Sequence, residues 1–157
     1  MNHVAFSIMN VKMSDGIVPF GRFLGNDSSH NFCNLARQFL DAAKFTDAGF
    51  KGAHSWPTYF LVFQSLENFL KAYLLEHGVT PGHVKSRVGH RICDALAEAK
   101  AKGLAVQAPK DVEDAVAALS RDYTARDFQY RSVGQWTVVL PSVVIDYVEA
   151  VSKAIDY

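Results

Sequence analysis

The sequence of this chain lacks the residue patterns by which most metal and disulfide proteins are recognised. Its 157 residues include only two cysteines, Cys33 and Cys93, which lie far apart and have no Cys-x-x-Cys or Cys/His partner at zinc-ligand spacing. We therefore expect two small core thiols in a reducing cytosol rather than disulfides. The histidines form no His-Glu-x-x-His, facial-triad or Glu-x-x-His pattern, so no metal and no cofactor is predicted.

Net charge and long apolar runs are also absent. Sixteen lysines and arginines balance sixteen aspartates and glutamates, which argues against a strongly basic, sequence-independent nucleic-acid binder but allows a local basic patch. No stretch approaches the roughly 20 apolar residues of a membrane span. The N-terminus also lacks the basic region and apolar run of a signal peptide. These absences predict a cytoplasmic protein with no membrane partner.

The sequence does contain strong helical periodicity. Its length and its hydrophobic content of 49% are typical of one globular domain. The clearest helix is predicted over residues 57–77, where apolar residues recur at steps of three and four before Gly78, a typical C-cap. These apolar residues are Tyr59, Phe63, Leu66, Phe69, Leu70, Tyr73 and Leu74. This helix must pack against others through that stripe.

The polar residues of the same helix are predicted to face away from the core. They are Gln64, Ser65, Asn68 and Lys71. Glu67 and Lys71 are four residues apart with the acid first, which is the favourable order for an ion pair on a helix. We expect this pair at the surface or at an interface.

Four further helices are predicted from caps and periodicity. They begin near the N-cap candidates at 27–29, near His90, near Pro109 and at Pro141. Before them, Val4, Phe6 and Ile8 alternate with polar or small residues. The predicted fold is all-α, an up-and-down bundle of about five helices over residues 27–157, preceded by a short extended N-terminal arm at residues 1–26.

Two polar segments are candidates for binding. The first is the loop 78–91, which has no acidic residue between Glu76 and Asp94 and carries several basic ones: His83, Lys85, Arg87, His90 and Arg91. Such a loop could hold a phosphate at the start of the next helix. The alternative is an ordinary solvated loop, since exposed loops attract lysine and arginine.

The second candidate is the segment 121–131, where arginines and tyrosines interleave. The residues that could stack on bases or contact phosphates are Arg121, Tyr123, Arg126, Tyr130 and Arg131. In the alternative interpretation, Asp122 and Asp127 pair with these arginines and the tyrosine rings pack internally. The segment has no clean period, which is typical of a loop specialised for function.

Several of these features resemble the HEPN domains, the "higher eukaryotes and prokaryotes nucleotide-binding" superfamily. The pattern Gln-x-x-Glu-x-x-x-Lys-Ala formed by Gln64, Glu67, Lys71 and Ala72 resembles the signature helix of the family. Residues 89–96, Gly-His-Arg-Ile-x-x-Ala-Leu, are similar to the opening of its next helix. Tyr123 with residues 128–131 resembles the Tyr…Arg-Tyr region, and the helix from Pro141 completes the layout. The resemblance covers residues 28–157.

The resemblance implies a compact helical bundle that dimerises. It also implies partners of the kind found in bacterial toxin–antitoxin pairs or phage defence, either a nucleotidyltransferase or an antitoxin-type protein. Many members are metal-independent ribonucleases in which an arginine precedes a histidine by four to six residues. In that chemistry the histidine moves protons at the ribose 2′-hydroxyl and the arginine stabilises phosphate charge.

This chain departs from the catalytic pattern, because His90 is its last histidine and nothing after Arg121, Arg126 or Arg131 can complete the motif. The resulting hypothesis is a non-catalytic homodimer that binds a partner protein, a nucleotide or RNA. Its binding residues would be Lys85, Arg87, His90, Arg121, Arg126, Tyr130 and Arg131. The alternative is a metal-independent ribonuclease with an unconventional site, formed by His90 with Arg87 or Arg126.

Overall fold

The computed structural model describes residues 28–125 and 139–155, and all regular structure in these ranges is helical. In chain order the elements are α1 (Ser29–Gly49), α2 (Trp56–Glu76), α3 (Pro81–His83), the π-helical turn η1 (Val84–Val88), α4 (Ile92–Ala101), α5 (Lys110–Thr124) and α6 (Pro141–Ile155). The all-α prediction is therefore confirmed for the described residues. The predicted arm at 1–26 and the candidates Arg126, Tyr130 and Arg131 lie outside the described residues.

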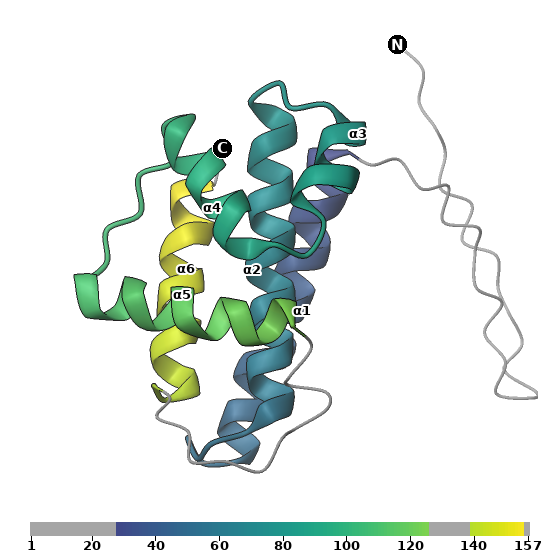
Figure 1. The fold of residues 1–157 in the computed structure, drawn as a ribbon. Coiled ribbons are helices and arrows are strands. Elements are labelled where there is room, and N and C mark those ends of the chain that lie inside the picture. Colours follow the sequence, from purple (N-terminus) through teal and green to yellow (C-terminus); the bar gives the residue numbers. More distant parts are fainter. Residues whose placement is uncertain (1–27, 126–138, 156–157) are drawn as a thin grey trace, which may run out of the picture.

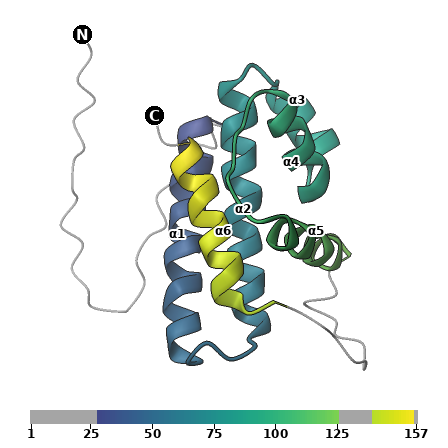
Figure 2. The same ribbon diagram turned by 90° about the vertical axis from the view of Figure 1, so that its left-hand side faces the viewer.

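Helix α2 forms the centre of the molecule. It lies beside α1 and α6, and the three helices run along one another (Figures 1 and 2). Its large apolar side chains are fully buried, among them Tyr59, Phe63, Phe69, Leu70 and Leu74. Burying each side chain of this size contributes about 1.5 to 3 kcal/mol. The predicted apolar stripe of this helix is confirmed.

The prediction of a polar outer face on α2 is wrong. Ser65 is fully buried, and its hydroxyl donates to the carbonyl of Ala36 in α1 at 2.8 Å. Asn68 is buried and donates to the carbonyl of Gln64, one turn earlier, at 2.6 Å. These hydrogen bonds allow polar side chains to face neighbouring helices, because a buried polar group is tolerated when it has a partner. Helix α2 is thus covered around most of its circumference.

Local capping explains where the first helices begin. The Ser28 hydroxyl accepts from the backbone N–H of Asn31, and the Ser55 hydroxyl does the same for Thr58. Pro57 follows Ser55 within the first turn of α2, where a missing N–H costs nothing. Of the three N-cap candidates at 27–29, Ser28 is therefore the one that caps α1.

Helix α5 departs from the predicted up-and-down order. It runs across α2 and α6 instead of along them (Figure 1). Side chains at both ends of α5 explain this direction: Tyr123 near its end reaches α2, while Val112 near its start lines the same small pocket as Tyr147 of α6. The crossing places the end of α5 against the middle of α2.

The predicted loop 78–91 also contains regular structure, because α3 and η1 form there. Thr80 caps α3, and the apolar side chains of Val84 and Val88 are buried beneath η1. The exposed side of this segment carries Lys85 and Arg87. Among the described ranges, no helix is long and apolar enough to cross a membrane.

Candidate anion-binding site

The site is organised by one buried carboxylate. Glu67, in the middle of α2, is only 3% exposed. It accepts hydrogen bonds from three donors: Lys71 Nζ at 2.5 Å, Tyr123 Oη at 2.7 Å and His90 Nδ1 at 3.0 Å. The expectation that Glu67 lies at the surface is wrong, and these donors explain how a carboxylate can be buried there.

Tyr123 approaches Glu67 from α5. Its ring stacks against Phe63 with a centroid distance of 5.8 Å, and Phe60 lies 6.2 Å away. Burial first, and then the negative charge of Glu67 and its hydrogen bond, raise the pKa of the Tyr123 hydroxyl far above its usual value. Tyr123 therefore remains a neutral donor to Glu67 throughout the physiological range.

Lys71 approaches Glu67 from the next turn of α2. Its side chain is 12% exposed, and its ammonium also lies 5.8 Å from the centre of the Phe32 ring of α1. An ammonium over an aromatic face is stabilised by the ring quadrupole. These two contacts hold the Lys71 ammonium in one place at the edge of the buried region.

The end of the π turn places His90 beside Glu67. Gly89 has a positive φ of 50° and donates its N–H to the carbonyl of Val84 at 2.9 Å. The carbonyl of His90 is held in turn by the Thr124 hydroxyl of α5 at 3.0 Å. The imidazole contacts Glu67 through Nδ1, yet 65% of the side chain is exposed. His90 thus joins the buried network to the solvent.

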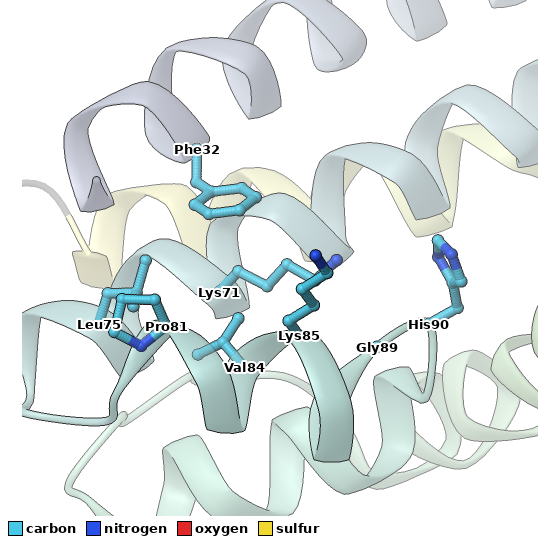
Figure 3. Close-up of a pocket in the computed structure, with 8 residues that line it drawn as sticks. All are labelled: Phe32, Lys71, Leu75, Pro81, Val84, Lys85, Gly89 and His90. Atoms are coloured by element: carbon cyan, nitrogen blue, oxygen red, sulfur yellow. The ribbon is translucent and has the colours of Figure 1, made fainter. Parts of the chain in front are cut away.

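A pocket of about 260 Å³ opens beside this network. Two lysines and His90 contribute polar groups to it, and the rest of the wall is apolar apart from the backbone of Gly89. The lining residues are Phe32, Lys71, Leu75, Pro81, Val84, Lys85, Gly89 and His90 (Figure 3). We call this hollow the Lys71–His90 pocket. The figure shows the ends of Lys71 and Lys85 on the same side of the Phe32 ring, where their charges can act on one ligand.

The structure brings together only some of the predicted site residues. Lys85 and His90 share the Lys71–His90 pocket, whereas Arg87 is exposed on η1 and is not part of its wall. Arg121 lines a separate hollow of about 330 Å³ with Arg91 and Thr124. Gln64 contributes its backbone carbonyl, which accepts a hydrogen bond from the side chain of Asn68.

Two aromatic residues of the site have roles that the sequence does not predict. Phe32 lies in the first predicted helix, and its contact with Lys71 depends on how α1 packs against α2. Tyr123 is expected either to stack on bases or to pack internally, and the structure shows it packed internally against Phe63. One signal points to the network: Glu67 lies four residues after Phe63, within the apolar stripe of α2. A carboxylate at such a position needs buried donors.

Within residues 28–125 and 139–155, no group of three or more His, Cys, Asp or Glu side chains is placed to hold a metal ion. Comparison of the chain with protein-family models, with curated proteins and with solved structures found no match. The function is therefore inferred from the residues of the site itself.

Proposed function

We propose that this chain is a HEPN-like, non-catalytic binding protein that holds the phosphate of a nucleotide or of RNA in the Lys71–His90 pocket. The proposal rests on one observation: a buried carboxylate, which holds neighbouring side chains in place, lies beside a pocket lined by cationic side chains. Glu67 fixes Lys71 and His90 at one edge, and Lys85 adds a further charge to the same wall.

The charges of the pocket favour an anion. Glu67 offsets the charge of Lys71, but the described residues provide no carboxylate partner for the ammonium of Lys85. Phe32, Leu75 and Val84 give the pocket an apolar wall against which a base or sugar could pack. Its volume of about 260 Å³ lies just below the usual range of small-molecule sites, so it could hold no more than one nucleotide-sized unit.

The family proposal has two supports. The signature pattern on α2 supplies two central residues of the network, Glu67 and Lys71, and His90 comes from the segment that resembles the opening of the next family helix. The missing Arg…His pair favours binding over cleavage. We further propose a cytoplasmic setting of the toxin–antitoxin or defence type, with a nucleotidyltransferase or an antitoxin-type protein as partner.

Binding can be measured by fluorescence anisotropy with a labelled RNA oligonucleotide, with unlabelled nucleotides as competitors. We expect Lys85→Ala to weaken binding several-fold. The number of phosphate contacts derived from the salt dependence of the affinity should fall by about one. The matched control is Lys110→Ala, which removes the same charge from the exposed start of α5. Equal affinity in the wild type and the Lys85 variant would contradict the assignment.

A ribonuclease is the second candidate function, and one observation favours it. The pairing of His90 Nδ1 with the Glu67 carboxylate at 3.0 Å is a geometry that orients an imidazole to act as a general base. In this version Arg87, or Arg126 outside the described residues, would stabilise phosphate charge. Incubation of the protein with total RNA in EDTA, beside His90→Ala, decides between the two. Cleavage that requires His90 would replace the binding proposal.

We also propose that the chain forms a homodimer. Helix α1 leaves large apolar side chains in solvent, with Phe45 84% exposed and Leu35 41% exposed. Exposed apolar surface of this kind is common where another protein binds. Light scattering at micromolar concentration should give twice the chain mass of 17.4 kDa. A monomeric mass would contradict the dimer.

A further inference from the structure

We infer that binding of an anion in the Lys71–His90 pocket is coupled to the uptake of one proton by His90 Nε2, so that ligand affinity rises as the pH falls. This inference rests on the proposed function and names how the same site is regulated. It depends on the geometry around His90 and on the charges that face it.

The contact with Glu67 fixes the hydrogen position on the neutral imidazole of His90. Nδ1 lies 3.0 and 3.1 Å from the two carboxylate oxygens of Glu67. An ionised carboxylate can only accept, so the proton of a neutral imidazole must be on Nδ1. Lys71 and Tyr123 donate to the same carboxylate and stabilise its ionised form. The opposite nitrogen, Nε2, therefore carries a lone pair.

The lone pair on Nε2 excludes a hydrogen bond from neutral His90 to an anion. An oxygen of a phosphate is also an acceptor, so neutral His90 has nothing to offer it at Nε2 and would repel it. A proton on Nε2 makes the imidazole a donor on both sides, since both nitrogens of the cation carry hydrogen. Contact between His90 and an anion thus requires the charged form.

Charged and titratable groups face His90 from α2, α5 and η1. On α2, Lys71 is balanced by Glu67, and on α5 Tyr123 is neutral. On η1, Lys85 and Arg87 are positive and exposed. Glu67 is the nearest charge to the imidazole, and a bound anion adds a second negative charge that favours a proton on Nε2.

Arg91, next in the chain, completes the charges near His90. Its guanidinium is paired with Asp94 of α4 at 3.2 Å and also donates to the carbonyl of Arg87. Arg91 lines the separate hollow beside Arg121 and is not part of the wall of the Lys71–His90 pocket. One linked proton sets an upper limit of about tenfold in affinity per pH unit.

The test uses a labelled hexauridylate RNA without terminal phosphates, because its phosphodiesters do not titrate across the histidine range. For the wild type we expect the dissociation constant to rise by about tenfold per pH unit on the alkaline side of that range. His90→Asn keeps an amide donor for Glu67 but cannot titrate, so its affinity should be nearly flat with pH. Lys85→Ala should bind more weakly at every pH while keeping the slope.

A second measurement needs no variant. Calorimetric titration of the wild type at several pH values in buffers of different ionisation enthalpy counts the protons taken up on binding, and we expect a net uptake that approaches one proton as the pH rises. A pH-independent wild type, a His90→Asn variant with the wild-type slope, or an uptake of zero would overturn the inference and leave the binding proposal intact. Absence of binding at every pH would overturn the proposed function and the inference with it.

Discussion

The inner and outer sides of His90 are built from different kinds of contact. On the inner side, Glu67 is buried and shared by three donors, two of which come from other parts of the chain. On the outer side, Lys85 and Arg87 are exposed on a short π turn. The inner contacts are therefore expected to contribute to folding, whereas the outer charges are available for a ligand.

The largest expected effect comes from removing the inner carboxylate. Glu67→Ala leaves the Tyr123 hydroxyl and the Lys71 ammonium without their acceptor, so the free energy of unfolding should fall by about 3 to 5 kcal/mol. Urea denaturation followed by circular dichroism measures this change. Glu76→Ala on the exposed end of α2 is the control and should cost less than about 1 kcal/mol. If both substitutions lowered the free energy of unfolding equally, the contacts on the inner side of His90 would have no special role in folding.

Alkaline pH tests the buried tyrosines of the same core. Burial, with a smaller contribution from Asp47, raises the pKa of Tyr59 to about 12, and burial with Glu113 does the same for Tyr147. A pKa raised on folding means stability that is complete below the usual tyrosine pKa of about 10 and is lost as the pH rises toward about 12. The loss should reach about 2 kcal/mol for each tyrosine. Denaturant midpoints across this alkaline range measure it, and a midpoint that rises with pH would contradict the assignment.

A smaller effect is expected from the hydroxyl of Tyr123. Tyr123→Phe removes one of the three donors to Glu67 and should lower the free energy of unfolding by about 1 to 2 kcal/mol. The matched control is Tyr147→Phe, because the buried Tyr147 hydroxyl has no hydrogen-bond partner among the described residues. That control should be neutral or stabilising. If both substitutions cost the same, the bond to Glu67 contributes nothing of its own.

The smallest effect on stability is expected at the outer side. Lys85→Ala should change the free energy of unfolding by less than about 0.5 kcal/mol, because an exposed lysine contributes little to folding. The same variant should lose affinity for RNA or nucleotide when binding is measured by anisotropy. A Lys85 variant that unfolds much more easily would show that the outer side also has a structural role.

The sequence predicted the helices well and the network poorly, for a physical reason. Helix periodicity and caps are local, so the helix expected over 57–77 appears as Trp56–Glu76 and the helix expected from Pro141 begins there. The burial of Glu67 depends on Tyr123 and His90, which lie 56 and 23 residues away along the chain. No local pattern encodes how α5 crosses α2.

The loop 78–91 illustrates the same limit at shorter range. Two of its basic residues, Lys85 and His90, share a pocket wall. The sequence did not predict that Val84 and Val88 would be buried and would fold the loop into a helical turn. Residue type alone also failed to separate Lys85, which lines the pocket, from Arg87, which does not.

The π turn has a consequence for how the chain tolerates insertions and deletions. The bond from the Gly89 N–H to the Val84 carbonyl spans five residues, one more than an α-helix allows. Deleting a single residue between Val84 and Val88 would restore ordinary helical pitch and rotate the downstream residues by about 100° about the helix axis. His90 would then turn away from Glu67, although every residue of the network would still be present. A one-residue change in length within η1 should therefore abolish the site more completely than many substitutions on its surface.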